Sequence, residues 1–444
     1  MALAPAATAR AEVGALARLA GPLMVAQLAQ MAMGVVGTVA AGRLGVDALA
    51  AQALGSTTLV LVIVTGYGLM AGLDPHVARA VGEDDPKKAG ALYRQAIWIA
   101  VLGGALLTGA LLTAPALLRA MGQEPRLVTD TAEYLDIAAL GLVPAITYIT
   151  SRSFCSAVGK ARPVMVVAIL GNIVNAWLAF AAVDRGYGLA GIAWASVVCR
   201  VAMGAALVVW VDVAPGLQRY RTAWVRPGAL SLPILRSGTP LALQYLMEVT
   251  GFVVTTLWMG LLGASTLAAH EVALSIAAIA FQVPFAIGTA ASMRVGHAIG
   301  RRDPAAVQRS GWTAFGLGLL YALGSGAVMV ALREWMALQY LPSATAEVIA
   351  LTCHFLTIAA GFQIADGIQA IGFGVLRGMD DTRVPVLFNI LGFWLLGMPL
   401  GYIAVFRLHQ HADRLWWGLF LSLAVVATSL ILRFRHKSRT LQIV

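Results

Sequence analysis

The chain has 444 residues, of which 59% are hydrophobic and 12% are charged, and its mean hydropathy is +0.81. This composition excludes a soluble globular protein and is typical of a multi-span helical protein of the lipid bilayer. The formal net charge of +10 would suggest a nucleic-acid partner in a soluble protein. In a membrane protein basic residues report topology instead, so no nucleic-acid partner is expected.

Apolar segments of membrane-spanning length recur along the whole chain. Windows of about 20 apolar residues predict twelve spans, at 14–40, 48–73, 92–117, 130–151, 163–183, 188–211, 238–260, 267–291, 311–332, 348–374, 384–406 and 415–433. An even number of spans places both termini on the same side of the membrane. No cleavable signal peptide is expected, because the first apolar run continues as a full span.

The distribution of lysine and arginine indicates which side that is. The N-terminus, the loops after even-numbered spans and the C-terminal tail hold 23 of these residues, counting those at span edges, whereas the loops after odd-numbered spans hold seven. The remaining one, Arg200, lies inside the sixth span. Because cytoplasmic segments carry the excess of basic residues, both termini are expected in the cytoplasm.

The first two spans carry polar and helix-bending residues in an apolar setting. Pro22 lies early in the first span and is followed by Gln27 and Gln30. A proline inside a membrane helix permits bending, because neighbouring groups can satisfy the freed backbone. Asp74 and His76 stand near the cytoplasmic end of the second span, where they are interpreted as interface anchors or, alternatively, as gating residues.

The two halves of the sequence are related by an internal repeat at an offset of 218 residues. At this offset, residues 22–86 and 240–304 share 17 identities over 65 positions without a gap. The identities include Pro22 with Pro240 and several turn residues at fixed positions, which chance rarely reproduces. The repeat therefore indicates a duplication.

Each half carries six predicted spans, so both halves share one orientation in the membrane. We expect an all-α integral membrane protein of twelve transmembrane helices in two six-helix lobes, related by pseudo-two-fold symmetry. The N-terminal lobe is expected at 1–213, a cytoplasmic linker at 214–236 and the C-terminal lobe at 237–444. Such lobes can rock about a central cleft and expose it alternately to either side.

A carboxylate lies near the middle of the seventh span. Glu248 costs about 2.5–3.5 kcal/mol at membrane depth, so its presence indicates a function. Gln244 and Thr255 extend a polar stripe on the same helix face, although an interhelical hydrogen bond explains either of them alone. The repeat places the neutral Gln30 at the position equivalent to Glu248, which assigns the ionisable group to the C-terminal lobe.

A second membrane carboxylate lies in the tenth span. Asp366 has Gln363 one turn before it and Gln369 one turn after it. If the seventh and tenth spans line one cavity, Glu248 and Asp366 can share a proton or bind a hard cation through oxygen ligands. Two weaker candidates, His270 and Glu271, stand at the start of the eighth span. For Glu271 the structural and functional interpretations are evenly balanced.

Three stretches resemble the multidrug and toxic compound extrusion (MATE) family of secondary transporters, and the likeness covers essentially the whole membrane region. The family's first helix and following loop are similar to PLMVAQLAQMAMGVVGTVAAGRLGVDALAA. Its seventh helix and the start of the eighth are similar to TPLALQYLMEVTGFVVTTLWMGLLGASTLAAHEVAL, and its tenth helix and following loop to QIADGIQAIGFGVLRGMDDTRVP. The last two together are specific, because a generic twelve-span transporter would not have both.

The resemblance implies export of cationic, amphipathic compounds in exchange for Na⁺ or H⁺. Glu248 and Asp366 match the family's acids in helices seven and ten, which are tied to cation binding, and Pro22 matches a proline tied to helix bending. Phe362 stands where NorM-like members often have a tyrosine, so one oxygen ligand for Na⁺ is missing. Gly37 stands where bacterial members commonly have an aspartate, which removes the acid on which a proton site in the first lobe would depend.

We therefore expect a monomeric antiporter of the bacterial inner membrane that needs no cofactor beyond its coupling ion, H⁺ or Na⁺. Glu248 and Asp366 are the expected binding residues for this ion and for substrate, and metal ligands only if the ion is Na⁺. Small organic cations are the expected substrates. The candidates for lining the substrate cavity are Gln27, Gln30, Gln244, Thr255, Phe362, Gln363 and Gln369.

Two other functions stay open at this point. A flippase for a lipid-linked precursor would prefer a basic cavity, for which Arg200 is the main candidate. A membrane-embedded enzyme could in principle use the two acids, but the sequence has no P-loop, dinucleotide-binding glycine motif or HExxH motif, so an enzyme is not expected. The cysteines lack paired or metal-ligand spacing and are interpreted as packing residues: Cys155, Cys199 and Cys353.

Overall fold

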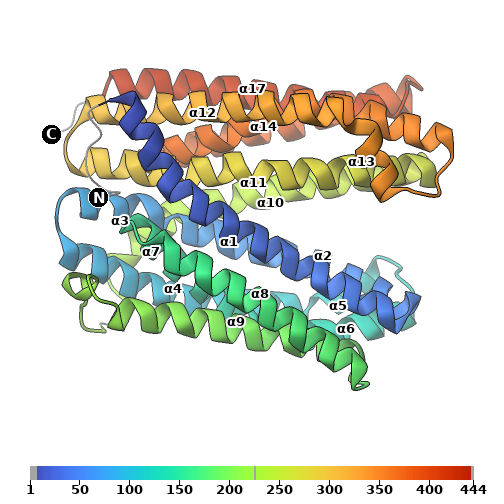
Figure 1. The fold of residues 1–444 in the computed structure, drawn as a ribbon, viewed down its shortest axis with the longest axis horizontal. Coiled ribbons are helices and arrows are strands. Elements are labelled where there is room, and N and C mark those ends of the chain that lie inside the picture. The colour runs from blue at the N-terminus through green and yellow to red at the C-terminus, as the bar shows by residue number, and fades with distance from the viewer. Residues whose placement is uncertain (1–7, 225–226, 442–444) are drawn as a thin grey trace. The chain divides into compact units, whose positions relative to one another are not determined.

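The computed structural model describes residues 8–224 and 227–441, and these residues are almost entirely helical (Figure 1). The first half forms α1 (Ala9–Leu44), α2 (Val46–Ala71), α3 (Leu73–Gly82), α4 (Pro86–Leu112), α5 (Ala114–Ala120), α6 (Pro125–Ala139), α7 (Leu142–Ala157), α8 (Ala161–Asp184) and α9 (Gly188–Val213). A 3-10 turn, η1 (Gln218–Tyr220), precedes α10 (Ser231–Leu261). The second half continues with α11 (Ala264–Gly300), α12 (Pro304–Ala331), α13 (Arg333–Tyr340), α14 (Ala346–Gly378) and α17 (Asp413–Arg439).

The expected all-α membrane architecture is confirmed. Among the described residues, eleven helices are long and apolar enough to cross a membrane, and a bent pair can supply the twelfth. That pair is α6 and α7, which meet at an angle of 47° where a continuous span over 130–151 was expected. The break lies at Leu140 and Gly141, whose backbone N–H groups donate to Ile137 and Ala138 in tight terminal turns.

One span departs from regular α-helix along most of its length. Between Arg383 and Arg407 the chain passes through α15 (Arg383–Asn389), η2 (Ile390–Gly397), α16 (Met398–Tyr402) and η3 (Ile403–Arg407), and both η2 and η3 are π-helical. The span packs closely on α17, as Gly397 shows: a Cβ atom at this position would lie only 1.8 Å from Ser422 Oγ. Apolar periodicity predicts the span at 384–406 but carries no signal for the wider π turns.

The described chain divides into two compact units. Gly21–Ala242 form one, called here the N-unit, and the chain up to Ala20 together with the chain from Leu243 onwards forms the other, the C-unit. The first turns of α1 therefore belong to the C-unit, and those of α10 belong to the N-unit. The helix α10 begins at Ser231, inside the stretch expected as a linker. Pro233 does not prevent this, because a first helical turn tolerates proline.

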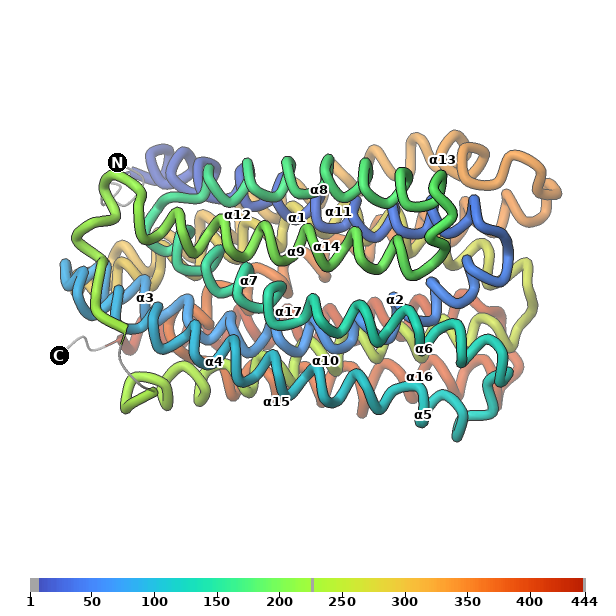
Figure 2. Tube along the Cα trace, turned by 90° about the horizontal axis from the view of Figure 1, so that it is seen from below, coloured from blue at the N-terminus to red at the C-terminus, as the bar shows by residue number. Residues whose placement is uncertain are grey.

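Helices of the N-unit pack around a core in which aromatic rings are prominent. The α8 and α9 helices lie side by side (Figure 2), α7 packs against α4 and α9, and α2 packs against α6 and α7. Tyr93 stacks on Phe154 with ring centroids 4.5 Å apart, and Tyr220 meets Phe154 edge-on at 5.8 Å. These contacts tie η1 to α4 and α7, so the start of the inter-half connection is part of the N-unit core.

In the C-unit, α14 is the central helix and packs against α11, α12, α13 and α17. Its contact with α11 is a backbone-to-backbone approach at small residues, as is common between membrane helices. A Cβ atom on Gly374 would lie 2.1 Å from the carbonyl oxygen of Gly288. This approach fixes the position of α14, which carries Asp366 about two turns earlier.

The repeat predicted from the sequence is visible in the backbone. Gly45 and Gly263, 218 positions apart, have φ angles of 115° and 114°, which favour glycine. Asp85 and Asp303 are likewise equivalent, and each caps a helix by accepting a hydrogen bond from a backbone N–H at 2.9 Å. The identities found in the sequence thus mark turns and caps that both halves need.

Candidate functional site

The predicted acid of the seventh span, Glu248, lies on the part of α10 that belongs to the C-unit and is partly buried. Its Oε1 accepts a hydrogen bond from Gln369 Nε2 at 3.4 Å. Gln369 lies on α14, one turn after Asp366. The structure therefore brings α10 and α14 together where the two predicted acids lie, which spacing in the sequence could not establish.

Asp366 is 5% exposed and lies one turn before Gln369, the residue that donates to Glu248. Its Oδ1 is buried without a hydrogen-bond partner among the described residues, and so is Gln369 Oε1. A buried acceptor without a donor costs about 1–3 kcal/mol, so such atoms in a native fold require an explanation. Two unpaired oxygens beside a second carboxylate form a set of acceptors that can take a proton or a small hard cation.

A segment of a neighbouring span contacts α10 beside Glu248. Trp394, in the π-helical segment η2, donates a hydrogen bond from Nε1 to the carbonyl oxygen of Met247 at 3.3 Å. Phe252, one turn after Glu248, packs edge-on against Phe393 of the same segment with ring centroids 6.2 Å apart. The wide turns of η2 thus place two aromatic side chains against the helix that carries the acid.

Several of the predicted lining residues make structural contacts in the C-unit. Gln363 donates from Nε2 to the carbonyl oxygen of Ala277 at 2.9 Å and so links α14 to α11. Thr255 donates to the Gly251 carbonyl oxygen at 3.0 Å. Phe362 is 1% exposed and packs on aromatic rings, with Phe252 at 6.2 Å and Trp416 at 5.6 Å between centroids.

The other predicted residues differ in burial and partners. Gln244 is 2% exposed, and its Oε1 has no partner among the described residues. In the N-unit, Gln27 is buried, and neither its amide nitrogen nor its amide oxygen has a hydrogen-bond partner among the described residues. His270 is fully buried and shares a hydrogen bond of 3.0 Å with Thr256 Oγ1, whereas Glu271 is exposed. Asp74 is buried in α3, and Pro22 lies inside α1.

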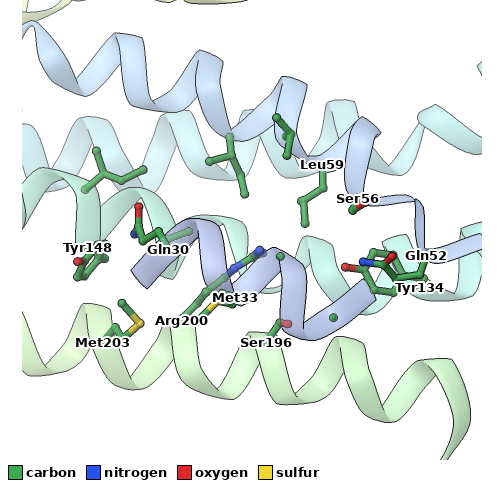
Figure 3. Close-up of a pocket in the computed structure, with 16 residues that line it drawn as sticks. Gln30, Met33, Gln52, Ser56, Leu59, Tyr134, Tyr148, Ser196, Arg200 and Met203 are labelled. Carbon is green, nitrogen blue, oxygen red and sulfur yellow. The ribbon is translucent and has the colours of Figure 1, made fainter. Parts of the chain in front are cut away.

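The N-unit contains a cavity of about 220 Å³ (Figure 3). Gln30 is the predicted lining residue found in it, and α1, α2, α6, α7 and α9 all contribute to its wall. Figure 3 shows Arg200 reaching into the middle of this group, with Gln52 and Tyr134 on one side and Tyr148 and Met203 on the other.

A metal centre is not indicated by side-chain clustering. Within 8–224 and 227–441, no group of three or more His, Cys, Asp or Glu side chains could hold a metal ion. A Na⁺ ion bound by Glu248 and Asp366 would therefore take its further oxygen ligands from amide side chains, such as Gln369, or from backbone carbonyls.

One protein-family model matches most of the chain. The MatE family model matches residues 22–181 and 240–403, once in each half of the chain. The chain belongs to the MatE family. This membership makes it a membrane transporter and not an enzyme.

Relatives and solved structures extend the match over nearly the full length of this MatE protein. It is 37% identical over 437 residues to the multidrug resistance protein NorM of Burkholderia vietnamiensis, covering 96% of this chain and 94% of the relative. The crystal structure of the eukaryotic MATE transporter AtDTX14 superimposes with a TM-score of 0.89 at 20% identity, over 97% of this chain and 98% of that one. An outward-facing multidrug resistance MATE family transporter also gives 0.89, at 19% identity and 96% coverage of both chains. The two-lobe fold of these transporters is thus the fold of this chain.

Sequence reasoning did not place the residues around the N-unit cavity of this MatE transporter. Gln52, Tyr134, Tyr148 and Ser196 come from four different helices, and nothing in their spacing brings them together. Arg200 did give a signal, since it is the one Lys or Arg that lies well inside a predicted span rather than near its edge. A charged residue at membrane depth points to a functional site by the same argument that selected Glu248.

Proposed function

We propose that this MatE transporter is a secondary active antiporter that exports cationic, amphipathic drugs or toxic organic compounds in exchange for H⁺ or Na⁺. The multidrug resistance relative supports the substrate class. The observation that carries the coupling is the acid cluster of Glu248, Asp366 and Gln369, with two buried, unpaired acceptor oxygens. A cluster that concentrates negative charge and acceptors inside a membrane protein suits a cation that binds and leaves.

Competition for this cluster is the simplest mechanism. When the coupling ion is bound, it cancels part of the negative charge of the two carboxylates, and the cluster attracts an organic cation less. When the ion has left, the full negative charge favours the organic cation instead. Because the two ligands cannot both be satisfied, binding of one lowers the affinity for the other by the same factor in both directions.

Phe362 bears on the choice of coupling ion. Its ring is enclosed by Phe252 and Trp416, so this position offers no oxygen ligand to a metal ion. A proton needs a single carboxylate oxygen, and Asp366 Oδ1 is such an atom. This geometry favours H⁺, and Na⁺ requires oxygens from amides or backbone.

The substrate path follows from two lobes that expose the cluster alternately to each side of the membrane. We propose that the two units, which differ from the lobes predicted at 1–213 and 237–444 in the first turns of α1 and α10, move as bodies. We also propose that both termini lie in the cytoplasm of the bacterial inner membrane and that the monomer is the working unit. A reporter active only in the cytoplasm, fused after Val444, should be active. A reporter active only outside the membrane should be silent in the same place.

The test of coupling uses purified protein in liposomes that are loaded with a fluorescent organic cation. A pH gradient and a Na⁺ gradient are imposed in separate experiments. We expect efflux driven by the pH gradient, and we expect Glu248→Gln and Asp366→Asn each to abolish it while the protein still inserts. Glu347→Gln is the matched control, because Glu347 is an exposed carboxylate in the first turn of the same helix as Asp366.

Each outcome has a clear meaning. Efflux driven by Na⁺ alone would reverse the choice of ion but keep the acid cluster as its site. Normal efflux by well-inserted Glu248→Gln protein would remove the cluster from the mechanism altogether.

A further inference from the structure

The N-unit cavity has a charge opposite to that expected for a site that binds organic cations. Of the sixteen residues that line it, Arg200 alone carries a formal charge, and no carboxylate is among them. The other polar side chains are neutral and include Gln30, Gln52 and Ser196. On α1, Gly37 also lines this cavity and adds no charge to it.

Arg200 has no acidic partner among the described residues. No carboxylate of a described residue forms an ion pair with it, and its Nη1 is buried without a hydrogen-bond partner. Of the neighbouring hydroxyls, that of Tyr148 is likewise buried and unpaired. A guanidinium cannot shed its charge, so Nη1 is left as a donor for an acceptor that enters the cavity.

A structural role for Arg200 has one supporting contact. The side chain passes Gly141 at the break between α6 and α7, where a Cβ atom would lie 3.2 Å from Arg200 Cδ and 3.4 Å from Nη1. A cation beside the C-terminus of α6 is favourable. That role accounts for a positive charge at this point, but it leaves Nη1 without an acceptor and does not explain a cavity beside it.

We propose that Arg200 is the recognition residue for a carboxylate carried by an amphipathic substrate, so that the N-unit cavity binds zwitterionic organic compounds, which keep a cationic group, rather than simple cations. The planar guanidinium presents paired N–H donors that match the two oxygens of a carboxylate. The hydroxyl of Tyr148, which lines the same cavity, supplies a further donor.

The rest of the cavity suits the body of such a molecule. Its wall includes Met33, Leu59, Ile63, Ile149 and Met203, and the methionines can adapt to substrates of different shape. The volume of about 220 Å³ lies below the roughly 300–1,000 Å³ of sites that enclose drug-sized ligands. It therefore accommodates the acidic end and an adjoining ring rather than a whole large drug.

This inference rests on the proposed transport function for its biological meaning, but its test is a binding measurement that needs no ion gradient. The full-length protein is placed in nanodiscs of zwitterionic lipid. The probes are a fluorescent quinolone that carries an amine and a carboxylate, and its methyl ester, which keeps the amine and the body but has no anion. Affinity is read from fluorescence anisotropy for wild type, Arg200→Gln, Arg200→Lys and the control Arg185→Gln.

Arg185 is a suitable control because it is exposed in the same unit and does not line the cavity. We expect Arg200→Gln to weaken binding of the acid at least about tenfold, the factor that corresponds to about 1.4 kcal/mol, and to change binding of the ester less than about twofold. Arg200→Lys should fall between wild type and glutamine, since lysine keeps the charge but not the paired donors. Arg185→Gln should match wild type for both probes.

Four results would overturn the proposal. Equal losses for acid and ester, together with a lower unfolding temperature, would assign Arg200 to the α6–α7 break. Wild-type affinity of Arg200→Gln for the acid would place the carboxylate elsewhere. Loss of acid binding when the nanodisc contains phosphatidylglycerol would identify a lipid phosphate as the occupant. Displacement of the acid by added chloride would identify an inorganic anion. Failure of antiport in the liposome experiment would leave these binding results unchanged, so the two proposals fail separately.

Discussion

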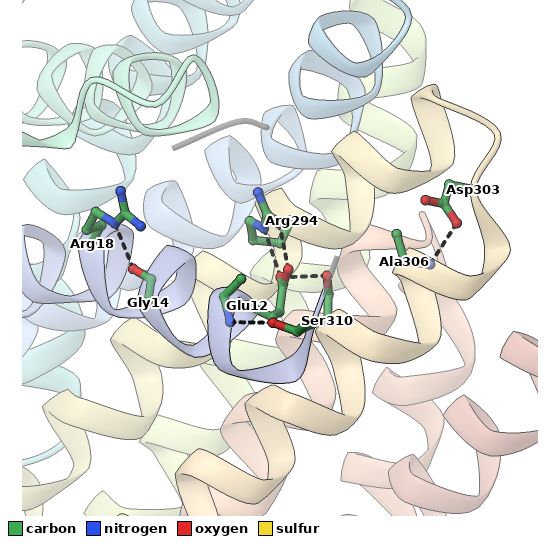
Figure 4. Close-up of polar contacts among 9 residues, drawn as sticks. Glu12, Gly14, Arg18, Arg294, Asp303, Ala306 and Ser310 are labelled. Atoms are coloured by element: carbon green, nitrogen blue, oxygen red, sulfur yellow. Dashed lines mark hydrogen bonds and ion pairs between the residues drawn. The ribbon is translucent and has the colours of Figure 1, made fainter. Parts of the chain in front are cut away.

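Glu12 and Arg294 form a buried, two-pronged ion pair within the C-unit (Figure 4). Arg294 Nε and Nη2 donate to the two carboxylate oxygens at 2.8 Å and 2.6 Å, and Ser310 Oγ donates to the same carboxylate at 2.7 Å. The two side chains are 1% and 2% exposed. The contact fixes the first turns of α1 to α11 and α12, although 282 positions separate the paired residues in the sequence.

Glu12→Gln should therefore destabilise the protein strongly. Breaking a buried pair by removing one partner typically costs about 3–5 kcal/mol, because the other charge stays buried without compensation. The measurement is the thermal unfolding midpoint of the protein in detergent. Glu83→Gln is the control, since its pairs with Arg79 and Lys88 are partly exposed and such pairs contribute at most about 1 kcal/mol. Equal shifts for the two variants would mean that the buried pair is not an anchor.

The equivalent of Arg294 in the first half is His76, 218 positions earlier. His76 Nε2 lies 3.2 Å from the carbonyl oxygen of Pro233 and 3.1 Å from Ser237 Oγ, both in the first turns of α10 within the N-unit. Each unit thus fixes the start of a helix whose continuation belongs to the other unit. One unit uses a permanent ion pair for this, and the other uses a histidine.

His76→Ala should cost less than Glu12→Gln. Hydrogen bonds of this kind contribute about 0.5–1.5 kcal/mol each, and the loss leaves no buried charge behind. The same measurement should give the highest unfolding midpoint for wild type, a lower one for His76→Ala and the lowest for Glu12→Gln. A histidine variant as unstable as the glutamate variant would show that the two equivalent contacts carry similar weight.

Pro22 and Pro240 are equivalent in the repeat and lie within two residues of the points where α1 and α10 pass from one unit to the other. A proline inside a helix removes a backbone hydrogen bond and lets the helix bend. Pro22→Ala should restore that bond, so we expect slower efflux from liposomes with unchanged or higher thermal stability. Pro115→Ala is the control, because Pro115 stands in the first turn of α5, where no hydrogen bond is lost. Wild-type efflux by Pro22→Ala would show that bending here does not limit transport.

The sequence predicted those features that a local pattern encodes. Apolar windows are a direct consequence of bilayer thickness, so the spans were predictable, and the turns at Gly45 and Gly263 follow from a φ that other residues rarely adopt. The acids Glu248 and Asp366 were found because charge at membrane depth is costly. That the helices carrying them meet through Gln369 was not predictable, because such contacts depend on how helices pack.

The remaining features escaped prediction for the same physical reason. The break at Gly141, the π-helical turns of η2 and the assignment of the start of α1 to the C-unit all arise from tertiary packing. Glu12 precedes the first predicted span, and its partner Arg294 lies in the loop after the eighth predicted span, so neither residue stands out in the sequence. Positive charge near a span edge is so common in membrane proteins that a topological role conceals a structural one.

Gly374 tests how strictly the α11–α14 contact sets the position of Asp366. A methyl group at this position would lie 2.1 Å from the carbonyl oxygen of Gly288, and neither backbone can yield without moving its helix. Gly374→Ala should destabilise the protein by about 1–3 kcal/mol, as overpacking does, and should reduce efflux because α14 carries the acid. Gly361→Ala is the matched control on the same helix, since a Cβ there meets nothing within 4 Å. In that position alanine should be neutral or stabilising by up to about 1 kcal/mol through its higher helix propensity. Similar thermal midpoints and efflux rates for the two variants would show that α11 and α14 can separate without disturbing the acid cluster.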